Sequence, residues 1–208
     1  MLKPTKLLFL PGASGNVDFW RPVAARLTHP AAHSFMAYPS FGGVPPDPTV
    51  NGFDDLVARV LRAIDQPVAL IAQSMGGALA LHAVLAAGAA ARAPITHLVL
   101  TATSGGLNVA ALGGMDWRPE LERSQPALPR WFSQEYRDVS ARLPDVRIPS
   151  LLLWGDADPI SPVAVGERLA QLLPLSKLHV LPGADHDLGM TRADEVAPLI
   201  DAHLRTQL

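Results

Sequence analysis

The sequence predicts an α/β fold in three layers, with a mostly parallel sheet of about six strands between two layers of helices. Three observations predict it. Six short apolar runs are spaced along 208 residues, amphipathic stretches of helical period lie between most of them, and a polar or glycine-rich segment follows each run. Strands that alternate with helices form βαβ units, in which the strands are parallel and the helices cover both faces of the sheet.

The expected strands are the six apolar runs. They are rich in branched and bulky residues, which is typical of strands that are buried on both faces. Ligands of such sheets bind beyond the carboxyl ends of the strands, so we expect the chemistry in the segments that follow the runs. In chain order the runs cover residues 6–10, 34–38, 67–73, 97–102, 150–155 and 177–181.

The expected helices are five stretches with helical periodicity. One region, residues 105–147, interrupts the alternation, since it contains no clear strand and only one helix-like piece, residues 129–143. This region is either a packed irregular excursion or a short cap over the substrate, within a single domain that spans residues 1–208. The helical stretches cover residues 18–27, 52–64, 76–88, 162–173 and 193–207.

Composition excludes several classes of function. The net charge of -2 provides no attraction for nucleic acid or an anionic membrane, so we expect a small-molecule substrate and no nucleic acid partner. The absence of cysteine excludes a thiolate nucleophile, a disulfide framework and a cysteine-bound zinc. The first apolar run is too short for a signal peptide or a membrane span, which predicts a cytoplasmic protein without membrane insertion. No particular oligomeric state is predicted.

Ser74 lies between the third expected strand and a helix, in the stretch AQSMGG. A strand-turn-helix elbow presents a nucleophile on a strained turn and requires small residues two positions before and after it. Those positions are Ala72 and Gly76. The alternative is that Ser74 is only a small residue in a tight turn. A serine nucleophile also needs an imidazole base, a carboxylate that orients the base and N–H donors for the oxyanion.

Candidates for the base and the carboxylate follow the last two expected strands. Asp156 and Asp158 lie in WGDADPISP after the fifth strand, and His186 lies in LPGADHDL after the sixth. Serine, aspartate and histidine therefore occur in this order, each just beyond a strand. Either aspartate could be the acid, and the other would be a turn residue.

The chain resembles the α/β-hydrolase superfamily over nearly its whole length, in its serine-nucleophile branch with a short cap. The stretches that carry the resemblance are FLPGASGNVDFW, AQSMGG, IPSLLLWGDADPISP and LPGADHDL. The first contains proline where the family usually has histidine. The chain begins at what the family counts as its third strand, so the resemblance implies a fold that lacks the first two strands.

The resemblance also implies the roles of individual residues. Ser74 would be the nucleophile, His186 the general base and Asp158 the acid, because the family pattern Gly-x-x-Asp selects Asp158 over Asp156. The backbone N–H groups of Ala13 and Met75 would form the oxyanion hole. Neither a cofactor nor a metal is implied.

Other polar and aromatic residues allow two interpretations. Trp117, Trp131 and Phe132 of the cap-like segment are candidates for substrate binding, with packing as the alternative. His82 lies on the helix after Ser74, where a packed histidine is the plainer interpretation. Ser14 belongs to the expected oxyanion turn, and Ser104 would line the pocket or make a turn. The remaining histidines that we considered are expected in solvent, in loops or on an outer helix: His29, His33, His97 and His203.

The predicted function is hydrolysis of a small ester or thioester through an acyl-serine intermediate, as in a carboxylesterase. The alternatives are a carbon–carbon bond hydrolase or a perhydrolase with the same triad, and a protein that binds a small ligand without turnover. A dinucleotide-binding reductase is disfavoured. GASG resembles its phosphate loop, but Asp18 stands where a third glycine is needed, and no Tyr-x-x-x-Lys pair is present.

Overall fold

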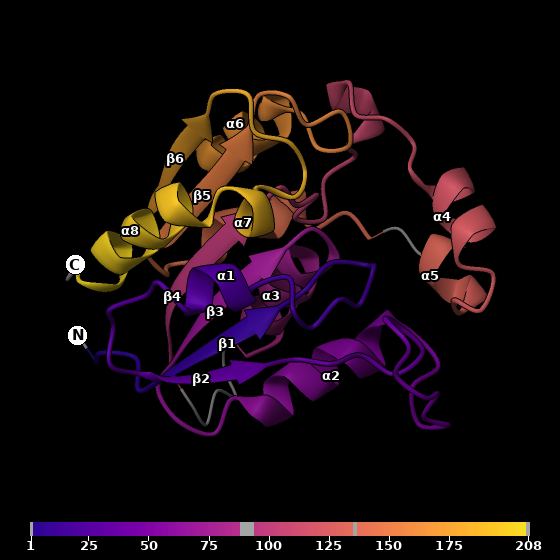
Figure 1. Cartoon of the computed structure of the whole chain (residues 1–208), viewed down its shortest axis with the longest axis horizontal. Coiled ribbons are helices and arrows are strands. Elements are labelled where there is room, and N and C mark those ends of the chain that lie inside the picture. The colour runs from indigo at the N-terminus through magenta and orange to yellow at the C-terminus, as the bar shows by residue number, and fades with distance from the viewer. Residues whose placement is uncertain (1, 88–93, 135–136, 207–208) are drawn as a thin grey trace.

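The six predicted strands form one sheet, and all of its pairs are parallel. A computed structural model describes residues 2–87, 94–134 and 137–206. The strand order is β2-β1-β3-β4-β5-β6 (Figure 1). The bounds are β1 Lys6–Leu10, β2 Ala32–Phe35, β3 Val68–Gln73, β4 Ile95–Thr101, β5 Ser150–Gly155 and β6 Ser176–Leu181.

The expected second strand, residues 34–38, is displaced toward the amino terminus. Strand β2 ends at Phe35, and the backbone N–H of Met36 makes a last bond to the carbonyl of Phe9. The chain then turns inward and buries Tyr38 and Phe41 completely. Burial of these two rings replaces further pairing with β1.

The strand order places a switch point between β1 and β3. From β1 the chain crosses to β2 on one side and then passes over to β3 on the other side. The loops that leave the carboxyl ends of β1 and β3 therefore diverge and leave a crevice between them. Pro11 follows the first of these strands and Ser74 follows the second.

Helices cover both faces of the sheet, as the alternation of elements predicted (Figure 1). Along β1 the residues alternate between two cores: Leu8 and Leu10 pack with α2, α3 and α6, whereas Leu7 and Phe9 pack with α1, α7 and α8. The bounds are α1 Arg21–Ala24, α2 Phe53–Ala63, α3 Met75–Ala87, α6 Val163–Leu172, α7 Leu188–Thr191 and α8 Ala193–Leu204. The short helix α7 was not expected from the sequence.

The described part of residues 105–147 contains no strand, in agreement with the sequence. The single helix expected over residues 129–143 is wrong. Two short pieces replace it, α5 Arg130–Gln134 and the 3₁₀ helix η2 Ser140–Asp145, and residues 135–136 lie outside the described ranges. Tertiary contacts override the helical pattern, since the N–H of Val139 bonds to the carbonyl of Gly106 and Arg137 forms an ion pair with Asp54.

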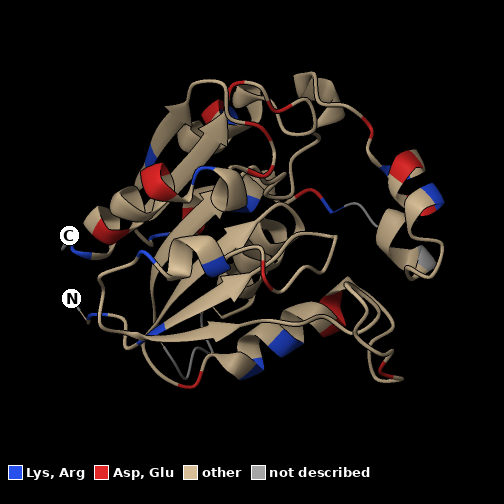
Figure 2. Cartoon of the chain, viewed as in Figure 1, with Lys and Arg blue, Asp and Glu red and all other residues tan. Residues whose placement is uncertain are grey.

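Two further pieces of this segment were missed, the 3₁₀ helix η1 Ala110–Leu112 and α4 Arg118–Ser124. Helices α4 and α5 lie side by side, away from the sheet and beyond the carboxyl ends of its strands (Figure 1). Charges of both signs are interspersed over the described chain, without a region of one sign (Figure 2). Among the described helices, none has the length and apolar composition needed to cross a bilayer.

His97 and His203 do not lie in solvent, so the expectation for these two histidines is wrong. Strand β4 begins at Ile95, which places His97 within the sheet, where it is 3% exposed. Its ring lies edge-on to that of His203, with 5.1 Å between the centroids. Burial, together with the nearby His97, lowers the pKa of His203 to about 4. His203 is therefore neutral in the folded protein at neutral pH.

This histidine should make the protein less stable in mild acid. Between the ordinary histidine pKa and about 4, the unfolded chain binds a proton that folded His203 does not. The contribution of neutral His203 to the free energy of unfolding is therefore fully present above about pH 6.5. It is lost as the pH drops toward 4, which lowers the free energy of unfolding by roughly 2–4 kcal/mol in total. Urea unfolding of wild type and His203→Leu from about pH 7 to about pH 4.5 checks this. The variant should lose less stability over that interval, and parallel curves would contradict the assignment.

Candidate active site

Ser74 occupies a strained turn between β3 and α3. Its φ angle is +51°, in the left-handed region that serine rarely adopts. Hydrogen bonds of the Ser74 backbone hold the turn. Its N–H donates to the carbonyl of Thr101 at 3.0 Å. Its carbonyl accepts from the N–H groups of Gly77 at 3.0 Å and Ala78 at 3.4 Å, and from the side-chain Oγ1 of Thr103 at 2.6 Å. Such strain is typical of a strand-turn-helix elbow.

The residues around the turn are small because two backbones approach each other there. A Cβ atom on Gly76 would lie 2.6 Å from the carbonyl oxygens of Leu10 and Pro11. Ala72, on the other side of Ser74, is completely buried in β3. The predicted elbow geometry therefore follows from the contact between the start of α3 and the end of β1.

Gly76→Val should damage both stability and activity. The branched side chain cannot fit against two backbone carbonyls, so we expect a loss of about 1–3 kcal/mol from overpacking and a displacement of Ser74. Thermal unfolding and the ester assay described below measure the two effects. Ala72→Gly is the control and should cost less, since it removes a methyl group rather than adding one. A Gly76→Val protein with wild-type stability and rate would contradict this placement of the elbow.

The loops after β5 and β6 bring Asp158 and His186 together. His186 Nδ1 lies 2.8 Å from Asp158 Oδ2, and the Asp158 side chain is completely buried. The other carboxylate oxygen accepts the N–H groups of Ile160 at 2.8 Å and Ser161 at 3.0 Å. An ionised carboxylate only accepts hydrogen bonds, so with Asp158 ionised this contact requires the proton on Nδ1 and leaves Nε2 free to accept another.

The second aspartate of this loop has a different partner. Asp156 Oδ1 accepts the N–H of Gly183 at 2.6 Å, which ties the loop after β5 to the loop after β6. Of the two candidates that the sequence left open, only Asp158 contacts His186. This choice depends on how the two loops fold, because both aspartates follow the same strand.

The turn after β1 contains the other predicted N–H donor. The N–H of Gly15 bonds to the carbonyl of Gly12, and Ser14 Oγ accepts the N–H of Asn16. Ala13 and Met75 both line the cavity beside Ser74. Among residues 2–87, 94–134 and 137–206, no acceptor takes the backbone N–H of either residue. Both groups therefore keep their donor capacity within the described chain.

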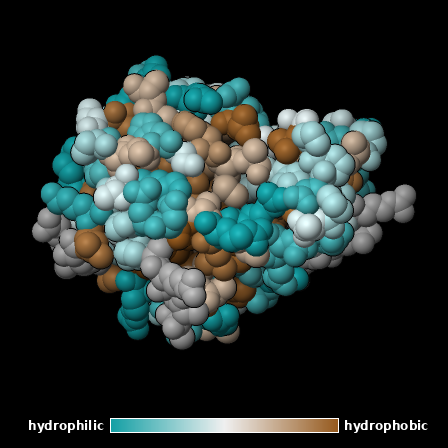
Figure 3. All heavy atoms as spheres, turned by 90° about the horizontal axis from the view of Figure 1, so that it is seen from below, coloured by the Kyte–Doolittle hydropathy of each residue, from teal (hydrophilic) through white to brown (hydrophobic). Residues whose placement is uncertain are grey.

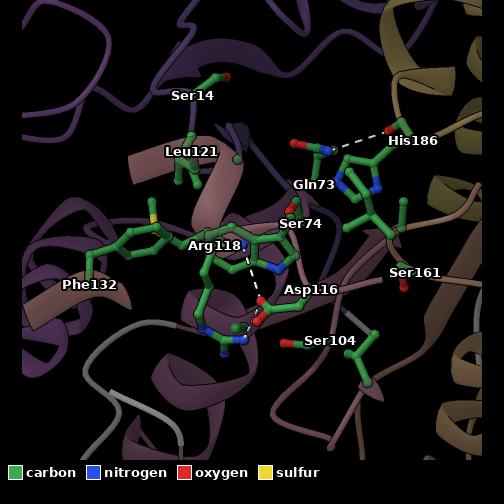
Figure 4. A pocket seen from close by; sticks show the side chains of 18 of the residues that line it. Ser14, Gln73, Ser74, Ser104, Asp116, Arg118, Leu121, Phe132, Ser161 and His186 are labelled. Atoms are coloured by element: carbon green, nitrogen blue, oxygen red, sulfur yellow. Dashed lines mark hydrogen bonds and ion pairs between the residues drawn. The ribbon is translucent and has the colours of Figure 1, made fainter. Parts of the chain in front are cut away.

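Ser74 and His186 line a cavity of about 680 Å³ at the carboxyl ends of the strands (Figure 4). The cap-like segment contributes much of the wall, including all three aromatic residues predicted to bind substrate: Trp117, Trp131 and Phe132. Figure 3 shows hydrophobic residues between the main body and the smaller lobe on the right, which contains α4 and α5. Ser14, Ser104 and His82 also line the cavity.

The aromatic residues of the cap-like segment pack against the body and also line the cavity. The ring of Phe132 contacts Trp117 and also Phe41 of the main body, at centroid distances of 5.5 and 5.3 Å. Trp131 packs on Phe41 as well, at 6.1 Å. The rings therefore attach the segment to the body while they line the cavity.

Gln73 is a site residue that the sequence analysis missed. Its Nε2 donates to the carbonyl of His186 at 3.4 Å, so it connects the end of β3 to the histidine loop (Figure 4). Its position directly before Ser74, as a polar residue ending a completely apolar strand, is the signal that could have identified it. Phe19 and Phe53 line the cavity too, but no local pattern distinguishes them from core residues.

The described residues contain no group of three histidine or acidic side chains that could hold a metal ion. The arrangement offers a serine on a strained turn, a histidine beside a buried carboxylate, and two N–H groups without an acceptor among the described residues, all around one cavity. These are the components that acyl transfer requires.

Known proteins share this fold. A family model described as alpha/beta hydrolase family matches residues 7–199. The esterase EaEST from Exiguobacterium antarcticum superposes with a TM-score of 0.78 at 14% identity, over 99% of this chain and 94% of that one. A meta-cleavage product hydrolase from Pseudomonas fluorescens IP01 gives 0.74 at 18% identity, over 97% and 90% of the two chains.

One curated relative is closer in sequence but over a shorter stretch. A putative non-heme chloroperoxidase from Synechocystis is 36% identical over 74 residues, which are 35% of this chain and 25% of that protein. The match thus spans a quarter of the length of this relative. The family model, in contrast, matches nearly the whole sequence, and the six-stranded sheet has the fold of this family. The chain belongs to the α/β-hydrolase family.

Proposed function

We propose that this protein is a serine hydrolase that cleaves a small ester or thioester through an acyl-serine intermediate. The observation that supports this most is the contact of 2.8 Å between His186 and the buried carboxylate of Asp158, beside a cavity that also contains Ser74. A structural serine would need neither the oriented imidazole nor the strained turn. In this proposal Ser74 is the nucleophile, His186 the general base and Asp158 the acid.

The first half of the reaction transfers the acyl group to the enzyme. Ser74 Oγ attacks the carbonyl carbon of the substrate, and its proton passes to His186 Nε2. The negative charge that develops on the carbonyl oxygen accepts hydrogen bonds from the N–H groups of Ala13 and Met75. Asp158 stays ionised and stabilises the imidazolium. The intermediate then collapses, and the leaving alcohol or thiol takes the proton from His186.

The second half regenerates the enzyme. A water molecule attacks the acyl-serine carbonyl while His186 takes one of its protons, and the same two N–H groups stabilise the second oxyanion. Collapse breaks the bond to Ser74 Oγ, which regains a proton from His186, and the carboxylic acid leaves. No step requires a metal or a cofactor.

We further propose that residues 105–147 form a cap within a single domain of residues 1–208. This segment carries Trp117, Trp131 and Phe132 to the cavity wall, where they would bind the substrate. The aromatic walls would exclude water from the acyl group and favour apolar acyl chains.

The test of this function is an assay with p-nitrophenyl esters of graded chain length. The wild type should hydrolyse some of them, and a fluorophosphonate probe should label the protein at Ser74 alone. Ser74→Ala is the matched control for both measurements. Labelling at another serine, or undiminished turnover by Ser74→Ala, would refute the proposal. A protein that binds ligand without turnover would give neither signal.

Perhydrolysis is a second candidate, because a relative of 36% identity is described as a chloroperoxidase. In this reaction hydrogen peroxide replaces water as the acceptor of the acyl group, so the products are a peracid and free Ser74. Adding hydrogen peroxide, acetate as the acyl donor and bromide should then generate a peracid, which oxidises bromide to hypobromite, and the hypobromite should brominate monochlorodimedone. If the enzyme hydrolyses esters but gives no halogenation, perhydrolysis is excluded and hydrolysis remains as the proposed reaction.

A further inference from the structure

Thr103, two residues beyond the end of β4, lies against the turn that contains Ser74. It is completely buried, and its neighbours Ala102 and Ser104 line the cavity whereas Thr103 does not. The φ angle of Ala102 is +45°, in the left-handed region that alanine rarely adopts, so the chain bends sharply as it leaves the strand. Beyond this bend, Thr103 Oγ1 donates to the carbonyl of Ser74 at 2.6 Å.

The direction of the Thr103 hydroxyl is fixed by its contacts. A hydroxyl has one hydrogen, which here goes to the carbonyl of Ser74, and its oxygen accepts the N–H of Gly105 at 3.1 Å. Helix α3 approaches so closely that a Cβ atom on Gly77 would lie 2.6 Å from Thr103 Oγ1. The second glycine of AQSMGG therefore makes room for this hydroxyl, as Gly76 makes room for the end of β1.

The carbonyl that Thr103 holds shares a peptide plane with the N–H of Met75, the expected oxyanion donor. This peptide is trans and planar, so its carbonyl and its N–H point in opposite directions. A contact that holds the carbonyl therefore also sets the direction of the N–H. The carbonyl accepts two further bonds, from the N–H groups of Gly77 at 3.0 Å and Ala78 at 3.4 Å, and the bond from Thr103 Oγ1 is the shortest of the three.

Thr103 is also connected to the loop that carries Asp158. Its carbonyl accepts a hydrogen bond from Ser161 Oγ at 3.4 Å, and the N–H of Ser161 donates to Asp158 Oδ1 at 3.0 Å. Both Thr103 and Ser161 are buried, which shields these bonds from water. The nucleophile turn and the acid loop are thus joined by a path that does not pass through His186.

We propose that Thr103 is a positioning residue that aligns the Met75 N–H with the oxyanion. The inference rests on the proposed hydrolase function and adds to it a residue that does not touch the substrate. With the hydroxyl in place, the oxyanion meets a donor that is already aligned, which is how such sites stabilise developing charge. Without it, the peptide after Ser74 tilts, because the strained φ of +51° at Ser74 relaxes when a contact that holds it is lost.

The kinetic experiment removes the hydroxyl in two ways. Thr103→Val places a methyl group against the carbonyl of Ser74, whereas Thr103→Ala leaves space and avoids this clash. Each variant should lower kcat on the best p-nitrophenyl ester by about ten- to a hundredfold, which is part of the effect of losing a whole oxyanion donor. KM should hardly change, because the donor acts on charge that develops only in the transition state. Thr103→Ser keeps the hydroxyl and should keep nearly the wild-type kcat.

Thr96 provides the matched control. It is a buried threonine of β4, and its Oγ1 also donates to a backbone carbonyl of β3, that of Val68, at 3.1 Å. Thr96→Ala and Thr96→Val should lower thermal stability as the Thr103 variants do, but they should leave kcat unchanged. A wild-type kcat in Thr103→Ala, or an equal loss of kcat in Thr96→Ala, would overturn the inference while leaving the hydrolase function intact.

The direction of the Met75 N–H can be measured without any turnover, which separates this inference from the proposed function. In weakly aligned protein with isotopically labelled methionine, the residual dipolar coupling of the Met75 amide reports this direction, and Met75→Leu identifies its signal. The coupling should change in Thr103→Ala and keep its wild-type value in Thr103→Ser and Thr96→Ala. A changed coupling supports the inference even if no ester is hydrolysed. An unchanged coupling in Thr103→Ala would overturn it even if esters are hydrolysed.

Discussion

Ser74→Ala and His186→Ala are each expected to lower kcat by about a millionfold, and the double variant should be little worse than either single one. The corresponding groups of a serine protease behave in this way, since they act as a unit and removal of one disables the other. The structure favours the same coupling, because His186 is oriented by Asp158 next to the cavity that contains Ser74. Steady-state and single-turnover kinetics on the best p-nitrophenyl ester measure it.

Thermal unfolding of the variants is the control for this prediction. Neither substitution should change thermal unfolding strongly, since Ser74 and His186 are both partly exposed. Losses that simply multiply in the double variant would show that the two residues act independently. The nucleophile and its base would then have to be sought elsewhere in the cavity.

Asp158→Asn should lower kcat by several orders of magnitude while it keeps the fold. The buried carboxylate accepts the Nδ1 proton of His186, and an amide in its place can donate instead and favour the wrong tautomer. The comparable substitution in a serine protease costs about 10⁴ in kcat. The pH profile of kcat provides a further measurement. An imidazolium that has lost its stabilising carboxylate forms less readily, so the profile of Asp158→Asn should differ from that of the wild type in its acidic limb.

Asp156→Asn is the matched control in the same loop. Its partner is the N–H of Gly183, which an amide oxygen can still accept, so turnover should fall far less than in Asp158→Asn. If the order of the two variants were reversed, Asp156 would be the acid, and the loop after β5 would have to turn differently during catalysis.

Features that depend on a few neighbouring residues could be predicted from the sequence. The apolar runs identified all six strands, with an error of a few residues at β2. The signal is strongest for β1, β3, β4 and β5, which are almost completely buried and therefore require apolar residues along their length. The small residues around Ser74 predicted the elbow, since local packing between strand and helix excludes larger side chains there. The order of serine, aspartate and histidine placed the candidate residues at strand ends.

Features that depend on residues far apart in the chain were decided by the tertiary structure. The sequence could not choose between Asp156 and Asp158 on chemistry alone, because both carboxylates follow one strand and the choice depends on where the loop after β6 carries His186. The helix expected over residues 129–143 failed for a similar reason, since contacts of Val139 with Gly106 and of Arg137 with Asp54 outweigh its local preference.

The same distinction applies to the histidines. His97 and His82 both lie among apolar neighbours in the sequence, yet His97 is buried against His203 whereas His82 reaches the cavity. The sequence by itself determined which segments are strands, where the elbow lies and which residue types follow each strand. Only the packing of distant segments decided which of those side chains meet, because a side chain's partners depend on strand order and loop path rather than on its neighbours in the chain.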